Sequence, residues 1–354
     1  GLWYGNNELA IMLNDGNDNF TKFNVDIITN LGFANFLDVD GDGKLDIICG
    51  RRYFRSDTAA IENLFYYKNN GNLEFTKIIL DNTINNAYER PFIADMNNDS
   101  KPDIVAIDVN SETSTRLSSL IIFNNKGNDQ YQKEWAIHSG KLTFYDWADL
   151  DNDGLPDYVY AFGGNGKLFW LKNRGNFKFD KPRVILDTLP FGYNYKVSFH
   201  IDDINNDGFK DVYGAANNIE FYSLNKGDNT FYPYSTMDTI NVLIQQDRPY
   251  GGASDFFQQF QYNDINSDGI DDIIYSNYES SFYRYSLGNG KFSQYYIIPE
   301  IVVTRLRDHT VDLVINDVNN DKINDFIYYP SPNDNKFMPY LNNGNTTFTP
   351  DTLK

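Results

Sequence analysis

The stretch DVDGDGKLD, residues 38–46, decides the fold, because it repeats along the whole chain. Its first, third, fifth and ninth positions are acidic, with glycine (Gly43) at position 6; the acidic residues are Asp38, Asp40, Asp42 and Asp46. Alternate residues of a tight loop point inward, so three carboxylates converge, the Lys44 carbonyl adds an oxygen and Asp46 closes the cage. Oxygen ligands without sulfur or imidazole are typical of a calcium site. Close carboxylates repel one another, which favours a bound divalent cation.

Six such boxes occur, and we number them 1 to 6 in chain order. They are DVDGDGKLD (38–46), DMNNDSKPD (95–103), DLDNDGLPD (149–157), DINNDGFKD (203–211), DINSDGIDD (264–272) and DVNNDKIND (317–325). Every copy has Asp at positions 1, 5 and 9 and Asp or Asn at position 3, which ordinary Asp- and Gly-rich turns do not share. The sequence therefore predicts up to six structural Ca²⁺ ions.

The predicted ligands are the side chains at positions 1, 3, 5 and 9 and the carbonyl at position 7. Beyond box 1 they are Asp95, Asn97, Asp99, Lys101 and Asp103; Asp149, Asp151, Asp153, Leu155 and Asp157; Asp203, Asn205, Asp207, Phe209 and Asp211; Asp264, Asn266, Asp268, Ile270 and Asp272; and Asp317, Asn319, Asp321, Ile323 and Asp325.

The box differs from an EF-hand loop, which needs a bidentate Glu at position 12 between helices. Position 12 is Cys49 in box 1 and Ala106 in box 2, and apolar runs flank each box. Position 6 departs from glycine at Ser100 and Lys322, where a strained backbone costs more. We expect boxes 2 and 6 to be the weaker sites.

The repeats predict an all-β fold. Each period reads as an apolar strand, a box, a second strand, and a third strand that ends in an Asn-Gly type turn before a fourth; such turns are a strong hairpin signal. Periods of about 40–60 residues are typical of propellers. We therefore expect a seven-bladed β-propeller of four-stranded antiparallel blades. The predicted single domain spans 1–354, with a partial N-terminal blade at 1–31 and full blades at about 32–90, 91–144, 145–198, 199–259, 260–311 and 312–354.

Composition and charge limit the classes of partner that the protein is expected to bind. The formal net charge is −19, but six Ca²⁺ carry +12 and would reduce it to −7, so most of the acidity belongs to the boxes. No basic stripe is present, which argues against nucleic acid. No apolar run is long enough to predict a membrane span, and no signal peptide is visible in this chain. The lone cysteine, Cys49, is predicted to be a small buried apolar residue.

The boxes and the Asn-Gly turns together resemble FG-GAP/VCBS-type repeats, as found in integrin alpha-subunit propellers and in many secreted bacterial proteins. The resemblance covers essentially the whole chain. It implies a seven-bladed propeller whose calcium ions brace loops on one face. It implies much less about activity, because this scaffold hosts lectins, adhesion modules and polysaccharide lyases.

The loops predicted on the opposite face are rich in Arg and Tyr, and loops on a rigid scaffold commonly carry binding residues. The predicted ligand-binding residues are Arg51, Arg52, Arg55, Tyr88, Arg90, Arg248, Tyr250, Arg305 and Arg307. Arginine beside aromatic rings favours an anionic glycan. Equally, these arginines could pair with acids of the same loops, and the tyrosines could pack between blades.

Three functions remain open. The first is an extracellular, secreted or cell-surface module that binds a glycan or a protein surface. The second is a polysaccharide lyase acting on uronic acids by β-elimination, which needs a cationic group and a base. Its candidate residues are His138, His309, Tyr145, Tyr193, Tyr195, Arg248 and Arg305. The third is a structural or adhesive domain of a larger surface protein. The sequence favours binding and leaves the oligomeric state open.

Overall fold

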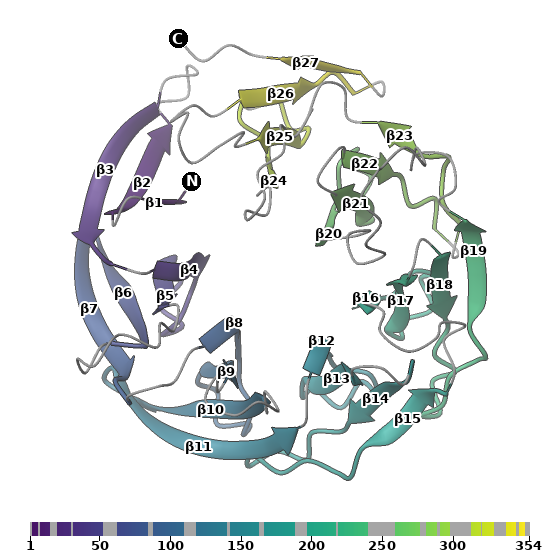
Figure 1. The fold of residues 1–354 in the computed structure, drawn as a ribbon, viewed down its shortest axis with the longest axis horizontal. Coiled ribbons are helices and arrows are strands. Elements are labelled where there is room, and N and C mark those ends of the chain that lie inside the picture. Colours follow the sequence, from purple (N-terminus) through teal and green to yellow (C-terminus); the bar gives the residue numbers. More distant parts are fainter. Residues whose placement is uncertain are drawn as a thin grey trace, which may run out of the picture. The chain divides into compact units, whose positions relative to one another are not determined.

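The computed structural model is all-β over the residues it describes. These are 2–5, 8–14, 20–29, 31–51, 62–83, 88–109, 118–139, 142–162, 166–187, 197–216, 219–239, 259–276, 281–288, 291–297, 313–319, 321–328, 338–344 and 347–350. Within these ranges no helix occurs (Figure 1). The strands form small antiparallel sheets in which consecutive strands are hydrogen-bonded neighbours. The all-β prediction is therefore confirmed.

The first sheet has three strands, β1 (Leu2–Gly5), β2 (Glu8–Asn14) and β3 (Phe20–Ile27). The next three have four strands each. They are β4 (Leu31–Leu37), β5 (Asp46–Arg51), β6 (Leu64–Gly71) and β7 (Glu74–Asp81); β8 (Tyr88–Ala94), β9 (Asp103–Val109), β10 (Ser118–Gly127) and β11 (Gln130–Ser139); and β12 (Leu142–Ala148), β13 (Asp157–Phe162), β14 (Leu168–Leu171) and β15 (Arg183–Leu186).

Three further four-stranded sheets follow. They are β16 (Val197–Asp202), β17 (Asp211–Ala216), β18 (Ile219–Ser223) and β19 (Ser235–Thr239); β20 (Gln259–Asn263), β21 (Asp272–Ser276), β22 (Ser281–Arg284) and β23 (Tyr296–Ile297); and β24 (Leu313–Asn316), β25 (Asp325–Tyr328), β26 (Met338–Asn342) and β27 (Phe348–Pro350).

The chain divides into two compact units, which we describe separately. The first comprises 1–13, 22–163 and 167–185, and the second comprises 14–21, 164–166 and 186–354. The prediction of one domain over 1–354 stays a prediction. Strands β8 and β12 begin at Tyr88 and Leu142, three residues before the approximate blade starts of 91 and 145 that the sequence suggested. Antiparallel pairing continues there, with Tyr88 opposite Asp108 and Leu142 opposite Phe162.

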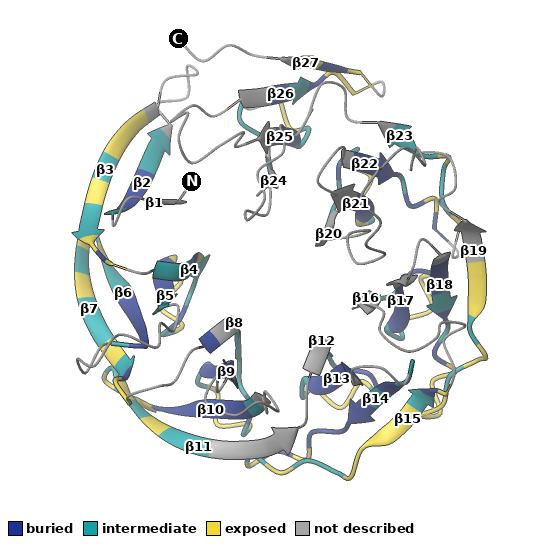
Figure 2. Ribbon diagram, in the orientation of Figure 1, coloured by how far each residue is buried: buried dark blue, intermediate teal, exposed yellow. Residues whose placement is uncertain are grey.

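In the first unit, the second and third strands of the four-stranded sheets are largely buried (Figure 2). Successive side chains of a strand point to opposite faces. Accordingly, Ile47 and Phe65 belong to a core cluster shared with β2, whereas the next residues, Ile48 and Tyr66, belong to a cluster shared with the β8–β11 sheet. Consecutive sheets of this unit thus pack against one another.

The second unit repeats this packing. One cluster joins Tyr213 of β17 with Ile273 and Phe282 of the next sheet, and another joins Ile274 and Tyr283 with Phe326 of the sheet after that. In both units each box forms the loop that connects the first strand of a four-stranded sheet to the second. The predicted position of the boxes within their sheets is confirmed.

Candidate metal centres

The position 1 aspartates organise each box by accepting hydrogen bonds from the loop backbone. In box 3, Asp149 accepts from the backbone N–H of Asp153 at 3.0 Å and from that of Gly154 at 2.7 Å. Boxes 2, 4, 5 and 6 repeat both bonds, and Asp38 of box 1 accepts from Gly41 and Gly43. These bonds turn the loop around the position 1 carboxylate.

The position 5 aspartate fixes the next part of the loop, and its Oδ1 accepts from the N–H of position 7 at 2.9–3.0 Å in all six boxes. The chain reverses here through left-handed residues. Position 6 has a φ of 83° at Gly43 and 88° at Gly154, and position 4 has 78° at Gly41 and 57° at Asn152. Glycine and asparagine adopt this region more readily than other residues, which accounts for their recurrence at positions 4 and 6.

Ser100 at position 6 of box 2 has a φ of 65°, so it carries the strain that the sequence predicts. Left-handed backbone costs about 1–2 kcal/mol for an ordinary residue, and glycine loses about 0.5–1 kcal/mol in chain entropy. We expect Ser100→Gly to raise the free energy of unfolding by about 0.5–1 kcal/mol, as measured by chemical denaturation.

The matched control is Gly154→Ser in box 3. Gly154 has a φ of 88° and nothing lies within 4 Å of a Cβ built there, so the change adds backbone strain without a clash. It should lower the free energy of unfolding by a similar amount. If both variants left stability unchanged, the left-handed strain would not be real.

The position 9 aspartate anchors the box to the third strand of its sheet. In all six boxes its Oδ1 accepts a backbone N–H at 2.7–2.8 Å, either from the third strand (boxes 1, 2 and 6) or from the segment directly after it (boxes 3, 4 and 5); the donors are Asn69, Asn125, Asn173, Asn225, Ser286 and Asn342. In five boxes its Oδ2 also accepts the N–H of position 2 at 2.9–3.2 Å. A carboxylate offers about four lone pairs, so these bonds leave room for a cation.

Burial perturbs the position 9 carboxyls. All six are fully buried. Loss of solvation raises the pKa of Asp103 to about 6 and the pKa values of Asp157, Asp211 and Asp272 to about 7, and it raises those of Asp46 and Asp325 as well. A buried carboxylate without a cation is destabilised. A nearby divalent cation would favour the charged form.

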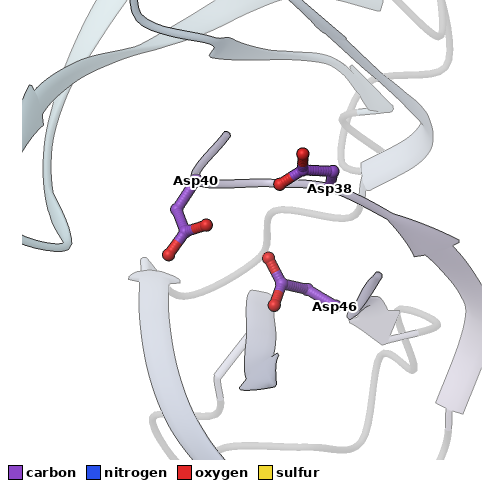
Figure 3. A group of neighbouring side chains, drawn as sticks. All are labelled: Asp38, Asp40 and Asp46. Atoms are coloured by element: carbon purple, nitrogen blue, oxygen red, sulfur yellow. The ribbon is translucent and has the colours of Figure 1, made fainter. Parts of the chain in front are cut away.

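Among the described residues, two boxes bring three carboxylates together. In box 1 one carboxylate oxygen from each of Asp38, Asp40 and Asp46 lies within 4.8 Å of the other two, and the three side chains point toward a common centre (Figure 3). In box 3 the corresponding group is Asp149, Asp151 and Asp153. The sequence predicted all of these residues as ligands, and the structure brings them together.

The position 3 side chains provide a test of whether a cation fits. Among the described residues, Oδ1 of Asn97 and Oδ1 of Asp151 are buried without a hydrogen-bond partner. An unsatisfied buried oxygen is costly, and these two are atoms that the sequence assigns to the metal. Together with the all-oxygen donor set, this arrangement suits a hard cation such as Ca²⁺. The residues therefore fit the predicted ion.

The predicted ligand-binding face is only partly described. Arg51 and Tyr88 lie in strands β5 and β8, and not in the loops where the sequence placed them. The Arg51 guanidinium donates to the Thr29 carbonyl at 3.0 Å and lies 3.6 Å from Glu62. The buried Tyr88 hydroxyl contacts Asp81 and receives a hydrogen bond from Lys133 at 2.9 Å. Both residues thus have the local role that the sequence left open as an alternative.

The other predicted residues of that face give less information. Arg90 lies in β8 and His138 in β11, and their side chains are outside the described residues. Tyr145 lies in β12 and packs against Tyr158, with ring centroids 5.9 Å apart. The residues outside the described ranges are Arg52, Arg55, Tyr193, Tyr195, Arg248, Tyr250, Arg305, Arg307 and His309.

The third-strand anchors are site residues that the sequence reasoning missed. The Asn173 side chain donates to the Pro156 carbonyl at position 8 and accepts from the Gly175 N–H at 2.9 Å. Asn69, Asn125, Asn225 and Asn342 repeat both contacts. The signal was present, because an asparagine two residues before a glycine recurs in five sheets, at the end of the third strand or directly after it.

Comparison with known protein families identifies the same repeats. The FG-GAP-like repeat family matches residues 38–106 and 149–214, which include boxes 1 to 4. No curated protein matches the chain. Among solved structures, an Agrocybe aegerita lectin that recognises non-reducing terminal N-acetylglucosamine is similar, with a TM-score of 0.62 and 20% identity over 84% of this chain and 75% of the lectin.

Two other structures are more distant. The Aleuria aurantia lectin, solved with α-methyl-L-fucoside, has a TM-score of 0.44 and 9% identity over 90% of this chain and 96% of that one. The V. cholerae biofilm matrix protein Bap1 has a TM-score of 0.43 and 13% identity over 76% of this chain and 40% of that one.

The fold places the protein in the class of β-propellers, which are built of small antiparallel sheets. Over residues 38–106 and 149–214 its repeats fit the FG-GAP-like repeat family. The resemblance seen in the sequence is thereby confirmed. In the part of the chain that the structure describes, no helix has the length and apolar character to cross a membrane.

Proposed function

We propose that the chain is an extracellular, calcium-stabilised β-propeller that binds carbohydrate. The calcium part is supported by the six boxes, in which carboxylates accept several backbone N–H groups and keep free lone pairs for a cation. Asp38, Asp149 and their equivalents would hold the ion together with the side chains at positions 3, 5 and 9 and the carbonyl at position 7. The ion would supply positive charge that neutralises each box. Calcium modules of extracellular fluid bind at about 10⁻⁴–10⁻³ M, which supports the proposed location.

We also propose that the sheets form one propeller of seven blades, of which the three-stranded β1–β3 sheet is the incomplete first blade. The numbers of strands support this proposal, with one sheet of three and six of four among the described residues. The carbohydrate part rests on the likeness in fold to the Agrocybe aegerita lectin. A rigid propeller presents loops at the ends of its blades, where binding residues are commonly placed.

The proposed binding face is the Arg- and Tyr-rich loop set. Its undescribed members Arg52, Arg55, Arg248, Arg305 and Arg307 carry the proposal, because Arg51 and Tyr88 have partners within the protein. Arginine forks match carboxylate and sulfate groups bidentately. An anionic glycan is therefore the ligand class to test first.

The test is migration of the protein in gels that contain neutral or acidic polysaccharides, in millimolar calcium. We expect retardation by at least one glycan, and a loss of at least about tenfold in affinity for the double variant Arg305→Ala with Arg307→Ala, since charge-assisted hydrogen bonds are worth about 1.5–3 kcal/mol each. The matched control, Arg174→Ala with Lys178→Ala, removes two exposed cations elsewhere and should leave the retardation unchanged.

The same incubations distinguish the remaining functions. A rise in the ultraviolet absorbance of an unsaturated uronate product would identify a lyase and overturn a purely binding role. Absence of retardation and of any product, for every glycan of the set, would reject carbohydrate binding and leave a protein surface as the partner.

A further inference from the structure

One side-chain position at or directly after the end of the third strand varies from sheet to sheet in a regular way. It is the residue directly before the anchor that donates its N–H to the position 9 aspartate. In boxes 1 to 6 these residues are Lys68, Asn124, Lys172, Leu224, Tyr285 and Leu341. The hydrogen bond common to all six sheets makes these positions equivalent, although the spacing from the box differs.

The two lysines match the two boxes with an additional acid. Position 3 is Asp40 in box 1 and Asp151 in box 3, and it is asparagine in the other four boxes. Lysine therefore occurs where position 3 is aspartate, and a neutral residue occurs where position 3 is asparagine. Four aspartates and one lysine have a formal charge of −3, which equals the charge of the three ligand aspartates in an asparagine box.

The structure places each of these lysines in direct contact with the position 3 aspartate of its box. The Lys172 ammonium contacts the Asp151 carboxylate and lies 2.7 Å from Asp153 Oδ2, and the side chains of Lys172 and Asp151 are each only 9% exposed. Lys68 Nζ lies 2.6 Å from Asp40 Oδ2, with Asp40 10% exposed, and 2.9 Å from Asp129 Oδ1. Both ammonium groups thus lie against carboxylates of the candidate metal centres.

The boxes with asparagine do not use a cation at this position. Box 2 has Asn124, whose Oδ1 lies 3.4 Å from Asn97 Nδ2, the amide at position 3. Boxes 4 and 6 have leucine, and Tyr285 of box 5 packs on Tyr283 with ring centroids 5.3 Å apart. A neutral position 3 therefore accompanies a neutral neighbour.

We propose that Lys68 and Lys172 are internal counter-ions of boxes 1 and 3, which reduce the affinity of these boxes for a divalent cation to that of the asparagine boxes. The ammonium group holds the position 3 carboxylate and repels an incoming cation, because like charges a few ångströms apart interact strongly at a half-buried site. The proposal rests on the proposed calcium binding. It assigns the two lysines a role in setting affinity, not in ligation.

Box 3 offers the sharper test, because Trp147 and Trp170 lie in its sheet. Terbium bound in box 3 can be detected by tryptophan-sensitised luminescence, and displacement of terbium by calcium gives the calcium affinity. The Asp149→Ala variant assigns the signal, since it removes the position 1 ligand of this box. The test variants are Lys172→Leu, Asp151→Asn and the two combined, which reproduces the pair Asn205 and Leu224 of box 4.

We expect Lys172→Leu to tighten calcium binding at box 3 by at least about tenfold and Asp151→Asn to weaken it. The combined variant should return to within about threefold of the unmodified protein, because the charge on the box is restored. The reverse exchange in box 4, Asn205→Asp with Leu224→Lys, should also leave affinity nearly unchanged, whereas Leu224→Lys alone should weaken it.

An unchanged or weaker affinity in folded Lys172→Leu would overturn the counter-ion role, and so would a combined variant that binds as tightly as Lys172→Leu. If Lys172→Leu fails to fold, the box 4 exchange decides, because equal losses in Leu224→Lys and in the exchanged pair would contradict charge matching. Absence of any terbium or calcium binding in the unmodified protein would instead reject the proposed calcium binding itself.

Discussion

Removing calcium with EDTA should lower the melting temperature of this protein by more than about ten degrees. The position 9 carboxylates are buried, and each box has three or four carboxylates at its predicted ligand positions, so loss of the cation leaves uncompensated charge in every sheet that carries a box. A ligand present at ten times its Kd stabilises by about 1.4 kcal/mol per site. Several sites together therefore contribute several kcal/mol.

The measurement is a thermal unfolding curve followed by circular dichroism, with and without EDTA, and with calcium restored in excess. Restored calcium should return the original melting temperature. Magnesium should restore much less, because it demands octahedral geometry and gives up its water reluctantly. An unchanged curve in EDTA, in a protein shown by elemental analysis to contain no calcium, would reject the metal assignment.

The effect of EDTA should grow with pH. Because burial raises the folded-state pKa of Asp157, Asp211 and Asp272 to about 7, the calcium-free folded protein binds more protons than the unfolded chain between about pH 4 and pH 7. Its stability must therefore fall as the pH rises through this window. Calcium binds the ionised form, so the difference between the two melting temperatures should be larger at pH 7.5 than at pH 5. A constant difference would contradict this coupling.

Replacing Arg284 with methionine should lower the free energy of unfolding by about 3–5 kcal/mol. In the second unit, the Arg284 guanidinium lies 2.5 Å from Glu220 of the neighbouring sheet, and these side chains are 5% and 1% exposed. Arg284 also donates to the Ser293 carbonyl at 3.0 Å and lies 3.3 Å from the Tyr295 hydroxyl. The variant leaves a buried carboxylate without its partner, and chemical denaturation measures the loss.

Two controls separate this pair from an ordinary ion pair. Arg174→Met breaks the exposed pair with Asp180, whose side chains are 55% and 37% exposed, and should cost about 0–1 kcal/mol. Glu220→Gln combined with Arg284→Met removes the stranded charge and should recover much of the loss. Equal losses for Arg174→Met and Arg284→Met would show that the buried pair does not have the importance we assign to it.

The sequence predicted the all-β fold and the position of the boxes between strands, because both depend on local pattern. A box such as Asp149–Asp157 fixes its own loop through hydrogen bonds between residues two to five positions apart. Its recurrence, with strands on either side, was enough to predict small antiparallel sheets with a box between the first and second strands. The placement of Cys49 was also correct, since it is a free buried cysteine.

The features that the sequence did not predict depend on contacts between strands that are distant in the sequence. Asp46 and Asn69, or Asp157 and Asn173, meet only after the third strand pairs, 23 and 16 residues away. The proximity of Lys172 to Asp151 follows from the same pairing. Tyr88 and Tyr145 were assigned to the loops that lead into the next sheet, but antiparallel pairing extends the first strands of those sheets to include both residues. A local pattern does not reveal where pairing stops.

The most direct test of the central claim is the number of calcium ions that the folded protein holds. The protein would be dialysed against millimolar calcium and analysed by inductively coupled plasma mass spectrometry, with a variant carrying alanine at Asp38, Asp149 and Asp264 as a control. We expect up to six ions per chain, one for each box in the sequence, and three fewer in the variant. A folded protein without stoichiometric calcium would contradict the account.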